Sequence, residues 1–303
     1  LTAAQFIAIS QFLRLITGWP LELSLLLSAL IVIVYTTLGG LKSEFFTDYF
    51  QAFFMLFIVV MLIYGFSAAG LNVIRQVEAG IEASLSVKDW LFVIAAFLFW
   101  APSLAASMDI WQRIFAAKDE AAATGAMRAS AIGLLVYFAI LTALGLVLRA
   151  IFPDVEGARI LAHAVGSLLP HIVLGAVLAG IFAALMSTAD SMLIVTSSTL
   201  TRDFYYRILR GRPGETEQLR FARFATIVAG ILALVVGWFM SDIVRLLSSA
   251  LSGLALLVPA VVGGLLWDGG GKKSAFLSIS VSFILFLFLT FALPADFAGA
   301  AMI

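Results

Sequence analysis

The chain alternates between long apolar runs and short polar interruptions. We predict nine apolar segments from this pattern, most of them close to the roughly twenty residues that an α-helix needs to cross a bilayer. The segments are residues 3–18, 21–39, 46–69, 90–107, 129–152, 169–200, 219–240, 243–267 and 274–294. Strands of a membrane barrel would instead alternate apolar and polar residues over about ten positions. The pattern therefore predicts an all-α integral membrane protein with about nine transmembrane helices.

Composition agrees with a membrane location and excludes several kinds of site. Of the 303 residues, 63% are hydrophobic and 12% are charged, and the mean hydropathy is +1.11. The net charge is zero, so no excess of basic residues suggests nucleic acid as a partner. There is no cysteine for a disulfide or thiolate site, and two histidines, His163 and His171, are too few for a histidine-rich metal site. Because Leu1 already lies in an apolar segment, we expect the chain to be an interior piece of a longer protein.

The distribution of positive charge predicts how the segments are oriented. Of the eighteen Lys and Arg residues, twelve fall in one set of alternate loops and five in the opposite set. Cytoplasmic loops carry the excess of Lys and Arg, so the richer set is expected to be cytoplasmic. This places the turn at 210–218 inside the cell and the loop at 152–160 outside it.

The stretch "AALMSTADSMLIVTSSTLTRDFYYR", residues 183–207, carries two adjacent hydroxyls at membrane depth. Residues three and four apart share a helix face, so the Ala184 carbonyl lies near the hydroxyls of Ser187 and Thr188. Three neutral oxygens suit a small hard cation, provided that a neighbouring helix supplies further ligands. The structural alternative is that such hydroxyls bond to a carbonyl one turn earlier or pack between helices. The residues alone leave both interpretations open.

Two carboxylates in the apolar segments are candidate coupling residues, because charge inside a membrane is costly. Asp190 follows Ser187 by one turn and could hold a cation or a proton, or bond to a neighbouring helix. Asp48 and Gln51 begin the third segment in "FFTDYFQAFF". There Thr47 could cap the helix, and Asp48 could favour the helix dipole. A second cation or proton site at Asp48 is the functional alternative.

The fourth segment, "FLFWAPSLAASMDIWQRIFAAKD", contains a proline in its middle. Pro102 breaks the ladder of helix hydrogen bonds, and broken membrane helices are found where they line a cavity or pack on protein. Trp100, Ser103 and Ser107 are therefore candidates for a substrate cavity. The alternative is an ordinary proline kink with aromatic residues in the core.

Three stretches together resemble the sodium:solute symporter family. They are "GGLKSEFFTDYFQ", "WQRIFAAKDEAAATGAMRAS" and "AALMSTADSMLIVTSSTLTRDFY", which agree with the family in order, spacing and sidedness. The resemblance implies a ten-helix inverted-repeat core of the leucine-transporter type, whose two repeats each begin with a discontinuous helix. On that frame, residues 1–303 are a single transmembrane domain fragment with core helices three to ten and one extra helix.

The resemblance also implies roles for individual residues. The sodium site takes the Ala184 carbonyl and the hydroxyls of Ser187 and Thr188, and Asp48 matches a position that affects sodium coupling. Trp100 matches an aromatic residue near the substrate in proline-type members. Those members have a tyrosine where this chain has Leu104, and sugar-type members have a tyrosine gate in place of Ser103. The family's known substrate patterns are therefore not reproduced here.

The resemblance predicts a secondary carrier, not an enzyme, in the plasma membrane. It would couple entry of Na⁺ to uptake of a small organic solute, with the lipid bilayer as its other partner and no nucleic acid. The alternative is a symporter-like sensor domain of a bacterial histidine kinase.

Overall fold

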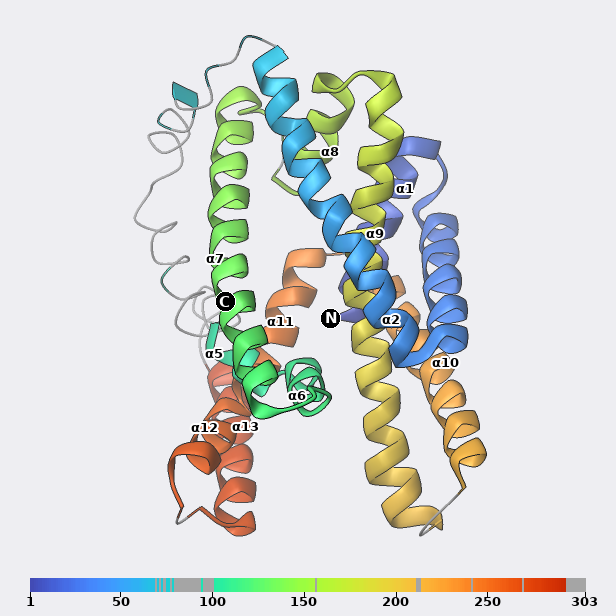
Figure 1. Ribbon diagram of the computed structural model, residues 1–303, viewed down its shortest axis with the longest axis vertical. Helices are drawn as coiled ribbons and strands as arrows, with labels where there is room; N and C mark the ends of the chain where they lie inside the picture. The colour runs from blue at the N-terminus through green and yellow to red at the C-terminus, as the bar shows by residue number, and fades with distance from the viewer. Residues whose placement is uncertain are drawn as a thin grey trace. The chain divides into compact units, whose positions relative to one another are not determined.

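The computed structural model describes residues 1–68, 70, 72, 75–76, 78, 94, 101–155, 157–210, 214–240, 242–268 and 270–292. Every regular element in these residues is a helix (Figure 1). The chain forms two compact units. The larger unit comprises residues 2–85 and 118–241, and the smaller unit comprises Leu1 and residues 86–117 and 242–303.

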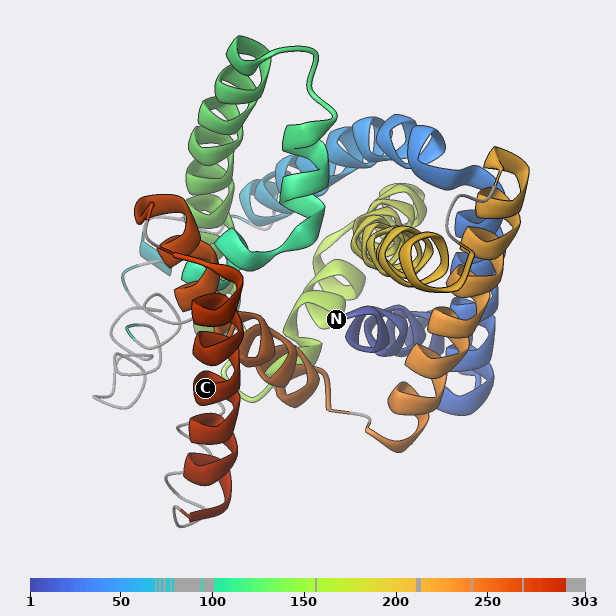
Figure 2. The same ribbon diagram turned by 90° about the horizontal axis from the view of Figure 1, so that it is seen from below.

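The larger unit is a bundle built around one long helix, α9. Its elements are α1 (Thr2–Thr17), α2 (Leu21–Ala68), α7 (Glu120–Ile151), α8 (Gly157–Leu168), α9 (His171–Thr199), η3 (Leu200–Arg210) and α10 (Glu215–Phe239). α9 packs against α1, α2 and α10, which surround it in the view along the bundle (Figure 2). A side chain on α9 can therefore contact a neighbouring helix in most directions.

α2 consists of two membrane-length limbs that meet at a sharp bend. The first limb is Leu21–Gly40 and the second is Glu44–Ser67. Gly40 lies at the bend with φ 65° and ψ −175°. Only glycine adopts this conformation readily, because a Cβ atom would clash with the backbone. The bend confirms the predicted break between the second and third segments at "GGLK", and it brings the second limb alongside α9.

The core at one end of the larger unit is formed by four helices. Buried apolar side chains come from α2, α7, α8 and α9: Ile58, Leu62, Phe66, Leu144, Val147, Leu148, Ala164, Val165, Leu169, Val177 and Ile181. α8 begins at Gly157, inside the loop predicted at 152–160, and contributes to this core. This packing fixes α9 against the second limb of α2.

The polar continuation of α9 is helical over a longer stretch than the sequence indicated. The predicted segment ended at residue 200, but the helix continues through η3 as an 11-residue π-helix to Arg210. A π-helix closes hydrogen bonds five residues apart and is rare in this length. α10 then returns alongside η3.

The smaller unit contains shorter elements. They are α5 (Ala101–Ser103), η2 (Leu104–Ala106), α6 (Met108–Phe115), α11 (Ile243–Ala255), α12 (Val258–Leu266) and α13 (Lys272–Ala292). α11 packs on α5 and η2, and α12 packs on η2 and α13. The predicted segment 243–267 is two helices, because Pro259, in the first turn of α12, cannot continue the ladder of α11.

Six helical spans of the described residues are long and apolar enough to cross a membrane, and the last of them runs through both α11 and α12. They are Leu21–Gly40, Glu44–Ser67, Glu120–Ile151, Val173–Arg207, Glu215–Phe239 and Leu246–Leu266. The chain is therefore a multi-pass membrane protein, as its composition predicts, whereas the count of about nine helices stays a prediction.

Candidate cation site

A hydrogen bond between two membrane-length helices joins residues far apart in the sequence. The Ser187 hydroxyl on α9 donates to Asp48 Oδ1 on the second limb of α2, at 2.8 Å across 139 residues of chain. Both side chains are half-buried. Hydroxyl and carboxylate oxygens are thus brought together within the membrane-length part of the bundle, where such groups are costly without a role.

One helical turn along, a second bond joins the same two helices. The Ser191 hydroxyl donates to Glu44 Oε1 at 2.5 Å, and both side chains are buried. Ser187 and Ser191 are four residues apart, as are Glu44 and Asp48, so each pair occupies one helix face. The two helices therefore meet along matched polar faces.

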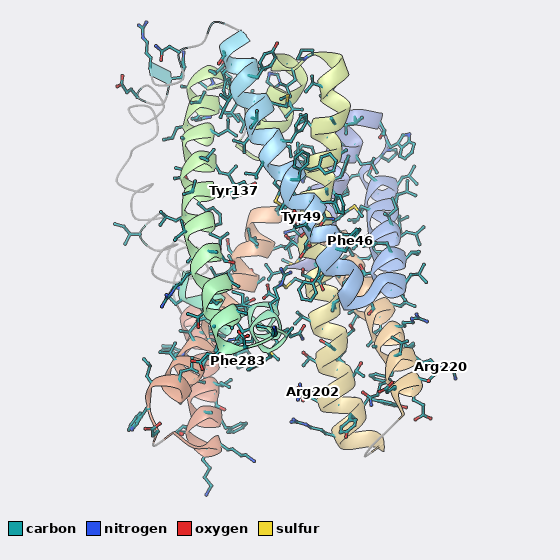
Figure 3. All side chains as sticks on the ribbon, viewed as in Figure 1. Phe46, Tyr49, Tyr137, Arg202, Arg220 and Phe283 are labelled. Carbon is teal, nitrogen blue, oxygen red and sulfur yellow. The ribbon has the colours of Figure 1, made fainter. Side chains whose placement is uncertain are left out.

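The opposite face of the second limb is aromatic and exposed. Phe46 is 67% exposed and Tyr49 79%, and both project from α2 in Figure 3. Gln51 is buried on the side that also carries Asp48. The polar residues of the second limb therefore face α9, and its large rings point outward.

Asp190 is completely buried. Its Oδ1 accepts the backbone N–H of Ser191 at 2.8 Å, whereas Oδ2 has no hydrogen-bond partner among the described residues. Oε1 of Gln51 is also buried and also has no hydrogen-bond partner among the described residues. Most buried polar atoms in proteins have a partner, so each of these oxygens requires an explanation.

The three predicted sodium ligands lie on one turn of α9. Ala184, Ser187 and Thr188 are each half-buried. Further along the helix, hydroxyls bond back to carbonyls of their own helix, in the way that the structural alternative expects: Thr196 to Met192, Ser197 to Ile194 and Ser198 to Val195. Ser187 bonds to Asp48 instead, and within the described part of the chain Thr188 makes no hydrogen bond. Neither hydroxyl therefore donates to a carbonyl of its own helix in the described residues, although the structural alternative expects such a bond.

The expected cap at Thr47 is wrong. The second limb begins at Glu44, two residues earlier than the predicted segment, so Thr47 lies inside the helix. Its hydroxyl donates to the Glu44 carbonyl at 3.0 Å. Asp48 consequently faces α9, which is the geometry that its functional alternative requires.

Sequence reasoning missed Glu44 and Ser191. Both are buried polar residues of this interface. The available signal was spacing, because Glu44 precedes Asp48 by four residues and Ser191 follows Ser187 by four. Spacing alone gives no reason to pair two helices separated by 147 residues of chain.

The candidate substrate residues belong to the smaller unit and are described by themselves. The helical backbone is interrupted there, because Ser107 has an extended conformation (φ −76°, ψ 119°) between η2 and α6. Ser103 is completely buried and Ser107 nearly so, and the Ser107 hydroxyl donates to Asp109. Leu104 is 46% exposed. Trp100 lies outside the described residues.

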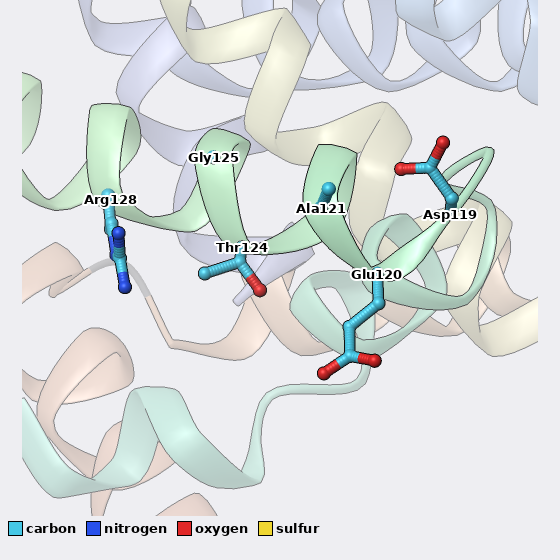
Figure 4. A pocket seen from close by; sticks show the side chains of 6 residues that line it. All are labelled: Asp119, Glu120, Ala121, Thr124, Gly125 and Arg128. Atoms are coloured by element: carbon cyan, nitrogen blue, oxygen red, sulfur yellow. The ribbon is translucent and has the colours of Figure 1, made fainter.

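A surface hollow on the first turns of α7 does not belong to this site. Figure 4 shows its lining, which includes Asp119, Glu120, Thr124 and Arg128. Asp119 has a structural role there, because its carboxylate accepts the N–H of Ala122 at 2.7 Å and caps the helix.

The described residues contain no group of three His, Cys, Asp or Glu side chains that could hold a transition metal. Neutral oxygens with one neighbouring carboxylate instead suit a hard monovalent cation.

Comparison with known proteins gives one consistent result. Residues 1–282 match the family model described as "Sodium:solute symporter family". A sodium/proline symporter of Staphylococcus aureus is 31% identical over 289 residues, which cover 90% of this chain and 56% of the relative. The corresponding protein of strain bovine RF122 / ET3-1 matches equally. The chain spans about half the length of these curated relatives.

A solved structure has the same fold. It is a Na⁺-coupled sialic acid symporter, described in a substrate-bound outward-open state with a novel Na⁺ site. The TM-score is 0.80 at 20% identity, and the match covers 99% of this chain and 68% of that one.

Proposed function

The chain belongs to the sodium:solute symporter family, and on that premise we propose that it is the major part of a carrier that couples Na⁺ entry to uptake of a small organic solute. The carrier would act in the plasma membrane. One observation supports the proposal most strongly: the hydrogen bond from Ser187 to Asp48 places a carboxylate beside the hydroxyl pair of α9.

In this proposal the Ala184 carbonyl and the hydroxyls of Ser187 and Thr188 bind the transported Na⁺. Oxygen ligands are those that a hard cation prefers, and the remaining ligands would be backbone carbonyls of a core helix outside this chain. Asp48 accepts the Ser187 hydroxyl and adds negative charge next to the ion. When Na⁺ leaves, the Ser187 hydroxyl keeps a hydrogen-bond acceptor, which limits the cost of leaving it buried.

Asp190 and the second limb of α2 would connect ion binding to the movement of helices. Asp190 is buried two residues from Thr188, and Ser191 links the same turn to Glu44. A shift of α9 against α2 would have to rearrange these bonds together. We therefore propose Asp48 and Asp190 as coupling residues.

The architecture we propose is the inverted-repeat core of the leucine-transporter type. Residues 1–303 would supply core helices three to ten and one extra helix of a single transmembrane domain. The extended backbone at Ser107 supports a discontinuous first helix of the second repeat.

The proposed substrate class is a small organic solute. Proline is the first compound to test, because the relatives at 31% identity are named sodium/proline symporters. Trp100, Ser103 and Ser107 are the proposed cavity residues. No observation in the described part of the chain favours a sensor domain, so we do not propose one.

Uptake by the full-length protein in proteoliposomes tests this function. With labelled proline outside, an inward Na⁺ gradient should drive accumulation, and an equal K⁺ gradient should not. If proline is not taken up, other small solutes supplied as a mixture are assayed under the same two gradients. Accumulation that follows a proton gradient and ignores Na⁺ would overturn the sodium assignment.

A further inference from the structure

A pocket of about 660 Å³ lies between η3 and the first turns of α10. Its lining includes Thr201, Arg202, Tyr206, Arg207, Gln218 and Leu219. The volume is within the range of about 300–1,000 Å³ that is usual for ligand pockets. The pocket lies on the continuation of the helix that carries the cation site, beyond Ser187 and Thr188, and has no part in the proposed transport mechanism.

The two walls of this pocket are held together by aromatic stacking. Tyr205 of η3 and Phe221 of α10 lie with ring centroids 4.2 Å apart and planes 11° from parallel. Thr201 is buried, and its hydroxyl donates to the Ser197 carbonyl at 2.6 Å. These contacts fix both helices, so the pocket is formed before any ligand arrives.

The charged groups of the lining are two arginines. Arg202 is exposed, and within the described residues its guanidinium has no hydrogen bond or ion pair. Arg207 pairs with Asp203 at 3.5 Å on the surface, where such a pair contributes little. None of the described lining residues is acidic. Two guanidinium groups in one pocket match the geometry of a phosphate group, which arginine binds through paired hydrogen bonds.

The surroundings favour a phosphate that is carried by a lipid. Leu219 forms part of the wall and is 53% exposed, and exposed apolar side chains continue along α10 at Phe224, Ile227 and Ile231. Figure 3 shows Arg202 and Arg220 on the two helices at this end of the larger unit. Basic pockets between membrane helices on the cytoplasmic side bind anionic lipid headgroups, and this is the side that the charge distribution predicts.

We infer that this pocket binds the phosphate group of an anionic phospholipid. Arg202 and Arg207 hold the phosphate, and the acyl chains lie on the exposed apolar face of α10 that begins at Leu219. Binding would add to the Tyr205–Phe221 contact between η3 and α10, at the cytoplasmic end of the helix that carries the cation site.

Lipid retention by the full-length protein tests this inference. The protein is purified with phosphatidylglycerol and phosphatidylcholine in equal amounts, and bound lipid is counted by native mass spectrometry. Wild type should retain phosphatidylglycerol preferentially. The double variant Arg202→Gln/Arg207→Gln should lose apparent affinity for it by about tenfold or more. The matched control Arg220→Gln/Arg223→Gln removes the same charge from the same hairpin outside the pocket lining and should lose at most about threefold.

Each other outcome decides against the inference. Equal losses in the two double variants would show that diffuse positive charge attracts the lipid and that the pocket does not. Equal retention of the two lipids by wild type would overturn the inference even if the pocket variant failed to fold. Inorganic phosphate is titrated separately against protein in phosphatidylcholine alone. A rise in melting temperature there that phosphatidylglycerol does not reproduce would assign the pocket to free phosphate.

Discussion

Ser187, like Ser191, differs from the hydroxyl residues near the end of α9 in where its hydrogen bond goes. Thr196 and Ser197 donate to their own helix, whereas Ser187 crosses to Asp48 on α2. A hydroxyl that donates its proton across helices to a carboxylate keeps its lone pairs for a cation. This difference, more than the presence of hydroxyls, is the evidence for a cation site on α9.

Replacing Asp48 by Asn tests the role of its charge. The amide oxygen can still accept the Ser187 hydroxyl, so expression and folding should be retained. A hydrogen bond to a charged group contributes about 1.5–3 kcal/mol and one between neutral groups about 0.5–1.5 kcal/mol, so loss of the charge should cost about 1 kcal/mol or more, which corresponds to about fivefold or more in apparent Na⁺ affinity. The measurement is the Na⁺ dependence of uptake by the full-length protein. Asp203→Asn is the control, because Asp203 is 52% exposed and belongs to a surface pair. Equal Na⁺ dependence in both variants would exclude a coupling role for Asp48.

The sequence could predict the candidate residues more readily than their partners. Adjacent hydroxyls in an apolar run were enough to single out Ser187 and Thr188, and a carboxylate near membrane depth was enough for Asp48 and Asp190. Glu44 was missed, because it stands next to the predicted loop and its burial depends on α9 docking against it. A partner 147 residues away is fixed by tertiary packing, which no local pattern contains.

Helices are brought close together in the larger unit by glycines at particular contacts. A Cβ atom added at Gly230 of α10 would lie 2.3 Å from Ile33 Cγ1 on the first limb of α2. Such an approach is far inside van der Waals contact, so either the Ile33 side chain or the helices would have to move. Gly133 of α7, in contrast, has nothing within 4 Å of an added Cβ.

Gly230→Ala should therefore destabilise the protein, and Gly133→Ala should not. Overpacking a close contact costs about 1–3 kcal/mol, which should appear as a clearly lower melting temperature. At Gly133 the only change is the gain in helix propensity, up to about 1 kcal/mol in favour of the fold. The measurement is thermal unfolding of both variants in the same detergent. Equal melting temperatures would show that α10 does not pack this closely on α2.

Helix boundaries were predicted less well than the helices themselves. α7 begins at Glu120, nine residues before the predicted segment, because Asp119 caps a polar first turn that apolar periodicity does not detect. α9 continues through η3 for the same reason, since its polar extension packs on α10 outside the apolar run. Pro259 itself indicates the break between α11 and α12, but the apolar run continues through it and was predicted as one segment.

At the scale of the whole molecule, the bundle places two loops at opposite ends of the larger unit. The turn that contains Asp154 lies at the end formed by α7 and α8, and Gly214 begins α10 at the other end (Figure 1). Positive charge predicts that the first loop is external and the second cytoplasmic. Because residues 1–303 contain no cysteine, Asp154→Cys and Gly214→Cys each introduce the one thiol of this stretch.

A membrane-impermeant thiol reagent applied to intact cells should label only Asp154→Cys. After the cells are opened, both variants should react, which serves as the control for accessibility. Labelling of Gly214→Cys alone in intact cells would invert the topology and place the arginine-lined pocket on the outer side.

The central claim is that the hydroxyls of α9 bind the Na⁺ that drives uptake, and the Na⁺ concentration for half-maximal uptake tests it most directly. The comparison uses full-length wild type, Ser187→Ala, Thr188→Ala and Thr188→Ser. Loss of a hydroxyl contact between membrane helices costs only about 1 kcal/mol, so surface expression should be nearly unchanged. Each alanine variant should need a much higher Na⁺ concentration, and Thr188→Ser, which keeps the oxygen, should stay close to wild type. Normal Na⁺ dependence in both alanine variants would contradict the account and leave Ser187 and Thr188 as helix-packing residues.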